Sequence, residues 1–194
     1  MVEQGARVRL DAGGVVATWG STAEERSLPF PCDARVALPE ASLYRGVSVS
    51  APVETVFRWL CQLRVAPYSY DWLDNYGRTS PRVLTPGLDR LEVGQEVMRI
   101  FRLVDFAAGD HLTLMLRPAS SAWRTFGELA VTYRVVPMPP APAHHCRLLV
   151  KLVVRYPPGA WGAFMRRLLP WGDLLMMRKQ LLTLKKLAES GGTG

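Results

Sequence analysis

The stretch LYRGVSVSAPVETVFRWLCQL, residues 43–63, passes directly from one periodicity to another. Apolar and polar residues alternate from Leu43 to Val49, which is typical of a β-strand. Ser50 then fits a helix N-cap and Pro52 a first helical turn. Apolar residues recur at helical spacing from there to about Leu63. We therefore predict a strand that is followed at once by a helix.

Four stretches with strand character follow this pair, at residues 96–106, 111–116, 123–136 and 145–156. Leucines alternate with polar residues in the second of them, so that Leu112 and Leu114 lie opposite His111 and Thr113. Such alternation favours an antiparallel sheet with one apolar face and one face in water. If the leucines face the core, His111 faces the solvent.

The pattern becomes helical again between residues 161 and 189, with an expected break at Pro170. Residues 173–189 predict a long amphipathic helix with a wide apolar face. Asp173 lies near the start of that segment, where a carboxylate suits the helix dipole. The order of elements predicts an α+β fold in which a curved antiparallel sheet wraps around the C-terminal helix.

The length of 194 residues favours one domain with an arm. We assign residues 1–40 to an N-terminal arm, residues 41–190 to the domain and residues 191–194 to a disordered tail. Within the arm, Val8 to Ala17 predicts a short hairpin, and Ser21 with Glu24 fits a capping box. The prolines that follow favour an extended path around the outside of the domain.

Three segments resemble the START-like superfamily, also called SRPBCC, in its polyketide cyclase/dehydrase-like group. They are VSVSAPVETVFRWL at residues 47–60, YSYDWLDN at 68–75 and the final helix at 177–189. Residues 19–25 resemble the arm of that subgroup. The chain departs from the pattern at residues 65–67, VAP, where glycines are usual. The resemblance implies a helix-grip fold with a deep apolar cavity, in which members bind lipids, sterols or polyketides and only some catalyse a reaction.

In this fold the aromatic stretch from Tyr68 to Gly77 lies over one end of the cavity, and we interpret it first as a lid. Trp72 and Tyr76 are four residues apart, so the stretch either anchors a short helix or contacts the ligand directly. We expect aromatic, basic and apolar side chains to bind the ligand: Tyr68, Tyr70, Trp72, Arg99, Trp123, Tyr133, Met177 and Leu181.

General acid/base chemistry is the enzymatic alternative, and no catalytic residue is assigned. The candidates are the titratable residues Tyr68, Tyr70, Asp71, Asp74, Arg99, Asp105, His111 and Tyr133. Asp71 and Asp74 serve equally well as helix caps or as acids. The hydroxyl of Tyr133 either enters the cavity or donates to a backbone carbonyl.

Other chemistries lack their sequence signals. His144, His145 and Cys146 are adjacent, and neighbouring residues of a strand point to opposite faces, so we expect no metal site. Neither a glycine-rich cofactor loop nor a Gly-x-Ser-x-Gly nucleophile motif is present. The three cysteines form no disulfide framework, and the first 20 residues lack an apolar core, so we expect a cytoplasmic protein without a cofactor.

The net charge of +7 raises the question of an acidic partner. The arginines are spread along the chain, so we expect no nucleic-acid binding. Contact with a membrane surface is a further alternative, through Trp161, Phe164, Arg166, Arg167 and Trp171. Our first hypothesis is a protein that binds a small hydrophobic ligand, lipid or polyketide-like. A polyketide cyclase or dehydratase and a membrane-surface module are the alternatives, and the sequence does not indicate the oligomeric state.

Overall fold

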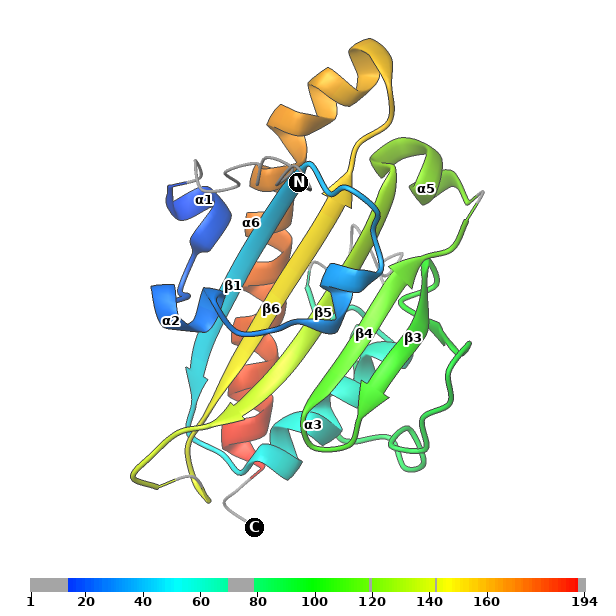
Figure 1. Cartoon of the computed structure of the whole chain (residues 1–194). Helices are drawn as coiled ribbons and strands as arrows, with labels where there is room; N and C mark the ends of the chain where they lie inside the picture. Colours follow the sequence, from blue (N-terminus) through cyan, green and yellow to red (C-terminus); the bar gives the residue numbers. More distant parts are fainter. Residues whose placement is uncertain (1–13, 70–78, 119, 142, 192–194) are drawn as a thin grey trace, which may run out of the picture.

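The computed structural model describes residues 14–69, 79–118, 120–141 and 143–191 (Figure 1). The first part of the expected hairpin, the lid from Tyr70 to Gly77 and the last three residues therefore lie outside the described residues. The strands are β1 (Ala41–Val49), β2 (Glu96–Val97), β3 (Phe101–Ala107), β4 (His111–Leu116), β5 (Glu128–Pro137) and β6 (Cys146–Arg155). The longer helices are α3 (Val53–Cys61), α5 (Ser121–Phe126) and α6 (Gly159–Ser190).

The six strands form one antiparallel sheet in the order β1-β6-β5-β4-β3-β2. The sheet curves around α6, which lies behind it in Figure 1, and α3 covers the lower end of the same face. The alternating leucines and valines of β4, β5 and β6 point to this side and form the main core with both helices. The predicted fold, a curved antiparallel sheet around a long C-terminal helix, is confirmed.

The outer face of the sheet is less wet than predicted, because the N-terminal arm crosses it (Figure 1). The arm contains α1 (Val15–Thr18), α2 (Ala23–Arg26) and the 3-10 helix η1 (Pro31–Ala34). Phe30, Cys32 and Val36 of the arm form a second small core with residues of β5 and β6. Ion pairs fasten the arm to the strands: Glu25–Arg147, Asp33–Lys151 and Arg35–Asp105.

Two expectations for the arm are wrong in detail. Val15 to Thr18 form a helical turn and not half of a hairpin. The capping box exists one residue later than predicted, because the Thr22 side chain accepts from Glu25 N and the Glu25 carboxylate accepts from Thr22 N.

The stretch predicted as a strand from Trp123 is also wrong over its first residues. The Ser120 side chain accepts a hydrogen bond from Trp123 N and starts α5, so residues 121–126 are helical. Gly127 ends the helix at a φ of 85°, and a Cβ there would lie 2.2 Å from the Arg155 carbonyl oxygen. Only glycine fits this junction, and β5 begins immediately after it.

Three other boundaries differ from the predictions. The strand expected at 96–106 is interrupted between β2 and β3, where Met98 and Arg99 have φ values of 48° and 63°. The α3 helix has Pro52 as its N-cap residue, while Ser50 N donates to the Glu189 carboxylate. The C-terminal helix continues through Pro170 without the expected break.

Candidate functional site

A cavity of about 410 Å³ lies between α6 and the concave face of the sheet. Four residues of α6 form one wall, at spacings of three and four that place them on one face of the helix: Asp173, Met176, Met177 and Gln180. Val131 and Tyr133 of β5 and Leu152 of β6 form the opposite wall. The cavity therefore lies between the two elements that define the fold.

The turn between β2 and β3 closes a further side of the cavity with Met98, Arg99, Ile100 and Phe101. Met98 and Arg99 both adopt left-handed backbone conformations, which side chains other than glycine rarely occupy. Backbone strain of this kind persists where the surrounding structure fixes it, and it concentrates at ligand sites. The Leu63 carbonyl holds the turn by accepting from Met98 N at 3.1 Å.

A fully buried hydrogen-bond chain crosses the cavity wall. The Tyr133 hydroxyl donates to Gln180 Oε1 at 2.8 Å, and Gln180 Nε2 donates to the Pro67 carbonyl at 2.6 Å. Burial and the nearby Asp173 carboxylate raise the pKa of the Tyr133 phenol, so it stays protonated. Tyr133 thus joins the sheet to α6 through a neutral, fully buried hydroxyl.

The second polar feature of the wall is a buried ion pair. Arg45 of β1 donates from Nη2 to Asp173 Oδ2 of α6 at 2.6 Å, with side chains only 1% and 6% exposed. Burial raises the pKa of the Asp173 carboxyl to about 6, and the Arg45 guanidinium opposes that rise only in part. Among the described residues that line the cavity, Asp173 therefore contributes a carboxyl whose pKa lies near neutral pH.

The predicted ligand residues divide into three groups. Arg99, Tyr133 and Met177 line the cavity together. Tyr68 and Leu181 are buried in the adjacent core, where Tyr68 packs edge-to-face on Trp59. Trp123 is 38% exposed on α5, outside the cavity lining. Tyr70 and Trp72, like the acid candidates Asp71 and Asp74, lie outside the described residues.

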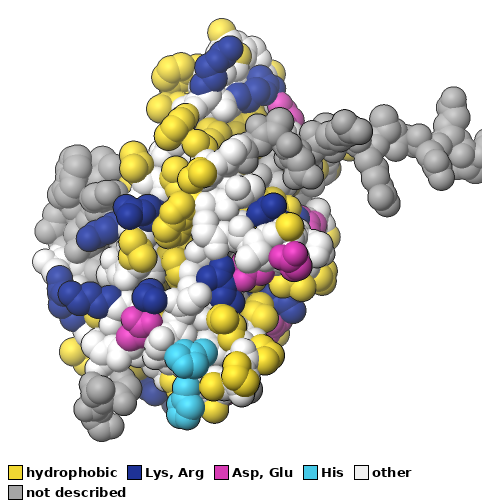
Figure 2. Space-filling view, turned by 90° about the vertical axis from the view of Figure 1, so that its left-hand side faces the viewer, with side chains coloured by type: hydrophobic (Ala, Val, Ile, Leu, Met, Phe, Trp, Pro, Cys, Tyr) yellow, Lys and Arg dark blue, Asp and Glu magenta, His cyan; other side chains and the backbone are white. Residues whose placement is uncertain are grey.

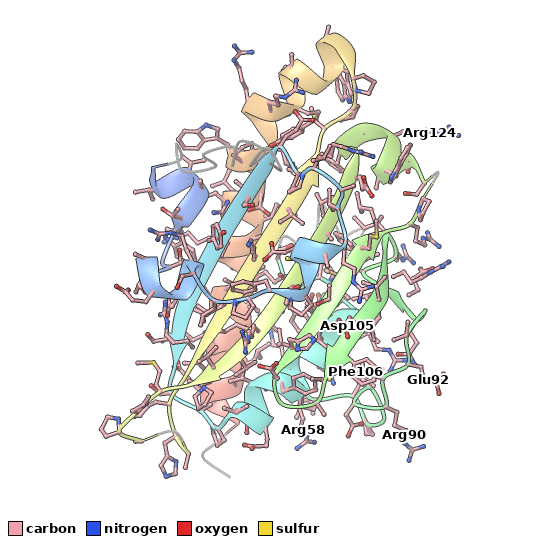
Figure 3. The ribbon with its side chains drawn as sticks, in the orientation of Figure 1. Arg58, Arg90, Glu92, Asp105, Phe106 and Arg124 are labelled. Carbon is pink, nitrogen blue, oxygen red and sulfur yellow. The ribbon has the colours of Figure 1, made fainter. Side chains whose placement is uncertain are left out.

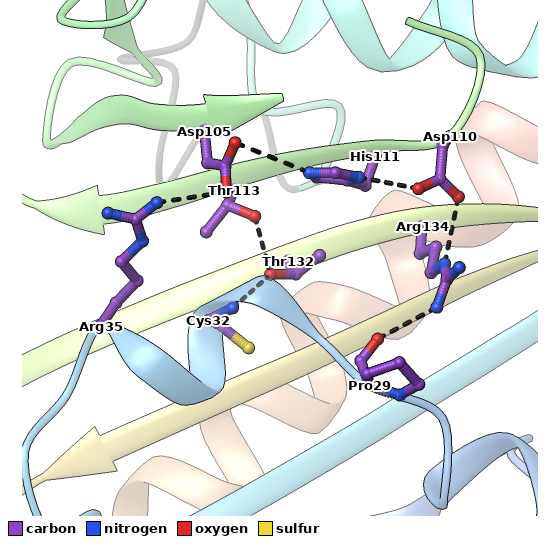
Figure 4. Close-up of polar contacts among 9 residues, drawn as sticks. All are labelled: Pro29, Cys32, Arg35, Asp105, Asp110, His111, Thr113, Thr132 and Arg134. Atoms are coloured by element: carbon purple, nitrogen blue, oxygen red, sulfur yellow. Dashed lines mark hydrogen bonds and ion pairs between the residues drawn. The ribbon is translucent and has the colours of Figure 1, made fainter. Parts of the chain in front are cut away.

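Two acid/base candidates lie on the wrong side of the sheet for cavity chemistry. Figure 3 shows Asp105 on the face of β3 that is turned away from α6, and Arg124 at the periphery. Asp105 pairs with Arg35 at 3.1 Å, and His111 Nδ1 lies 2.8 Å from Asp110 Oδ2 (Figure 4). His111 lies on the outer face of the sheet, but it does not face the solvent as predicted, because neighbouring side chains leave it only 12% exposed.

The remaining contacts in Figure 4 attach the arm to that outer face. Cys32 N donates to Thr132 Oγ1 at 3.0 Å, and Thr113 Oγ1 lies 2.9 Å from the same oxygen. Arg134 donates to the Pro29 carbonyl and to Asp110. These groups are satisfied by one another, which indicates a structural role.

The residues that the prediction missed include Asp173 and Gln180 of the cavity lining. They also include Arg45, which pairs with Asp173. The sequence contained a signal for two of them. Arg45 lies in the apolar alternation set of its strand, and Asp173 lies among leucines and methionines of a helix. A charged residue in an apolar set is expected to be buried with a partner, and these two have opposite charges.

Metal and thiol chemistry find no support in the described part of the chain. Within it, no group of three His, Cys, Asp or Glu side chains is close enough to hold a metal ion. Burial raises the pKa of the Cys32 thiol to about 11, that of Cys61 to about 12 and that of Cys146 to about 11. Thiols with such pKa values are poor nucleophiles at neutral pH.

No family model and no curated protein sequence matches the chain. Solved structures are similar to it in fold. The Zhui aromatase/cyclase of a Streptomyces species has 14% identity and a TM-score of 0.49, covering 79% of this chain and 96% of its own. A START superfamily protein of Mycobacterium smegmatis has 14% identity and a TM-score of 0.46, covering 77% and 97%.

The di-domain aromatase/cyclase StfQ of the steffimycin biosynthetic pathway has 13% identity and a TM-score of 0.46, over 79% of this chain and 52% of its own. The fold is established by the structure of this chain, from its strand order, its antiparallel pairing and the long C-terminal helix on the concave face. The chain has a helix-grip fold. Of the helices in the described residues, none is long and apolar enough to cross a membrane.

Proposed function

We propose that this helix-grip protein binds a small, largely apolar molecule with a hydrogen-bonding oxygen, such as a lipid or a polyketide-like carbonyl compound. The cavity between α6 and the sheet is the observation that carries the proposal. Its volume of about 410 Å³ falls in the range of roughly 300–1,000 Å³ that small-molecule sites occupy.

The lining supports the same class of ligand. Methionine, valine, leucine and phenylalanine side chains form most of the wall, and the flexible thioethers of Met176 and Met177 adapt to irregular shapes. A few polar residues, among them Arg99, Tyr133 and Gln180, contribute to this mostly apolar lining. Such sparse polar groups orient a ligand, whereas the apolar contacts supply most of its affinity.

A narrowed cavity tests this proposal. Ile100 lines the cavity and is 37% exposed, so Ile100→Trp adds volume at a site that tolerates a larger side chain. The matched control Val83→Trp lies at a position that is 78% exposed and outside the lining. We expect 1-anilinonaphthalene-8-sulfonate to bind the wild type and the control alike, and Ile100→Trp more weakly. Equal binding by all three proteins would place the site elsewhere.

One observation favours a second function, general acid/base chemistry on a polyketide-like chain. Asp173 places a carboxyl with a pKa of about 6 in the cavity wall, where it exists in both protonation states near neutral pH. Cyclisation and dehydration need such a group to donate or accept a proton beside a bound carbonyl.

A linear β-polyketone thioester is a suitable substrate for testing this function. We expect the wild type to convert it to a cyclised or dehydrated product, with a rate that changes near pH 6. Asp173→Asn should lose the conversion and keep 1-anilinonaphthalene-8-sulfonate binding. Absence of any wild-type product by mass spectrometry would leave the binding function and eliminate the catalytic one.

A further inference from the structure

The outward face of α6 carries a continuous row of exposed apolar side chains, which we call the α6 stripe. The stripe consists of Trp161, Phe164, Leu168, Trp171, Leu175 and Leu182, which are between 38% and 58% exposed. Their spacings of three, four and seven residues place them along one side of the helix. The cavity-lining residues of α6 lie on the opposite side, so the stripe is separate from the ligand site.

The stripe begins on a part of α6 that stands beyond the sheet (Figure 1). Trp161 is held there, because its indole Nε1 donates to the Thr125 carbonyl of α5 at 2.9 Å and its ring packs on Phe164. Trp123 of α5 is also 38% exposed. Single exposed apolar residues are ordinary, whereas a contiguous row of large ones marks an interaction surface.

The charges beside the stripe have one sign. Arg167, Arg178, Lys179 and Lys186 are exposed on α6, and Figure 2 shows basic and hydrophobic side chains together on the projecting end. The acidic residues of α6, which lies wholly within the described residues, are Asp173 and Glu189. Both are paired, with Arg45 and Lys185 respectively, so they do not offset the charge of the exposed row.

The exposed apolar row and the positive charges beside it distinguish between two possible partners, a second copy of the chain and an anionic bilayer surface. A second copy packed on the stripe would bring two rows of like charge together, which opposes association. An anionic bilayer surface complements the stripe twice, since the headgroups attract the arginines and lysines while tryptophan, phenylalanine and leucine enter the acyl boundary. We propose that the α6 stripe docks the protein onto an anionic lipid bilayer surface.

The geometry fits a helix that lies in the plane of the interface. From Trp161 to Leu182 the stripe is about 30 Å long at 1.5 Å per residue. Along this length the stripe is the exposed apolar side of α6, while the opposite side is buried against the sheet and lines the cavity. Tryptophan side chains such as Trp161 and Trp171 prefer the boundary between headgroups and acyl chains.

Co-sedimentation of the full chain with vesicles tests the proposal. The wild type is expected to sediment with vesicles that contain phosphatidylglycerol, to stay in solution with pure phosphatidylcholine, and to dissociate as salt rises. Arg167→Glu removes one positive charge and adds a negative one, so partitioning should fall roughly thirtyfold, on the order of fivefold per unit of charge. Trp171→Glu should abolish sedimentation.

Arg82→Glu and Val83→Glu are the matched controls, because both positions are exposed and lie far along the chain from α6. They should sediment like the wild type, and circular dichroism melting should be the same for all four variants. Ile100→Trp should keep vesicle binding, so a failure of the ligand proposal is distinguishable from a failure of this one.

Three outcomes would overturn the proposal. The wild type stays in the supernatant with phosphatidylglycerol vesicles at low salt, or the two control variants lose as much binding as the stripe variants. The third is a wild-type dimer in sedimentation velocity that Trp171→Glu converts to a monomer, which would assign the stripe to a second copy of the chain.

Discussion

Replacing Arg45 by methionine removes one partner of the buried ion pair and leaves the Asp173 carboxyl in the cavity wall without it. Both side chains are almost fully buried, and their atoms are 2.6 Å apart. Breaking such a pair costs about 3–5 kcal/mol of unfolding free energy, because the remaining charge loses both water and partner. We expect Arg45→Met to be destabilised by that amount near pH 7.5.

The pH dependence follows from the Asp173 carboxyl, whose pKa is about 6 in the folded chain against 3.8 for the free group. The folded chain binds this proton more tightly, so the contribution of this group to stability is largest below about pH 4 and declines as the pH rises through 6. The difference of about two pH units corresponds to about 3 kcal/mol.

In Arg45→Met near pH 4, the carboxyl is neutral and no buried charge remains, so the cost of the substitution should nearly vanish. Asp173→Leu should behave differently from Arg45→Met, because Arg45 stays charged at every pH in this range. We therefore expect Asp173→Leu to be destabilised at both pH values. The double variant Arg45→Met/Asp173→Leu should recover to near wild-type stability at pH 7.5, since apolar side chains often replace a buried pair without loss.

Urea denaturation followed by circular dichroism measures the free energies of unfolding of the wild type and the three variants at both pH values. Arg117→Met is the matched control, because it breaks the Arg117–Glu96 ion pair, whose side chains are 42% and 53% exposed. This substitution should lower the free energy of unfolding by only about 0–1 kcal/mol. Equal destabilisation of Arg45→Met at both pH values would refute the titration of Asp173. If the double variant loses as much free energy of unfolding as the two single variants together, Arg45 and Asp173 are not coupled.

Three further substitutions test the packing of α6 and of the cavity wall by thermal or urea denaturation. Gly162→Ala should destabilise the chain by about 1–3 kcal/mol, since its Cβ would lie 1.7 Å from the Pro157 carbonyl oxygen. Gly172→Ala, at a helical position with open space, should instead stabilise it by about 0.5–1 kcal/mol, and a loss there would contradict the packing described. Tyr133→Phe leaves the Gln180 oxygen without its buried donor and should cost about 1–3 kcal/mol, whereas an unchanged free energy of unfolding would mean that the bond contributes nothing.

The architecture was predictable because periodicity reports which side of an element is buried. The alternating leucines of β4 and the amphipathic pattern after residue 173 both point to the core that the structure contains. The predictions of the fold that were wrong concern features that depend on contacts between residues distant in sequence. The helix through Pro170 continues because packing on the sheet outweighs one missing hydrogen bond, and the Pro170 carbonyl itself accepts from Arg45 at 3.5 Å.

The candidate site was less accessible to sequence reasoning than the fold. Alternation placed Tyr133 on the cavity side of β5, and helical periodicity placed Met177 on the inner side of α6. The pairing of Arg45 with Asp173 joins residues that are 128 positions apart, and no local pattern brings them together. The apolar alternation predicted a strand from Trp123, whereas the Ser120 cap and Gly127 set the short helix α5 there.

Native mass spectrometry of the protein as purified tests the central claim, that the cavity between α6 and the sheet holds a small apolar ligand. We expect a native mass above that of the 21.6 kDa chain, which returns to the mass of the bare chain after denaturation. The added mass should fall in Ile100→Trp and persist in Val83→Trp. A native mass equal to that of the chain, unchanged after incubation with lipids and polyketide-like compounds, would contradict the claim.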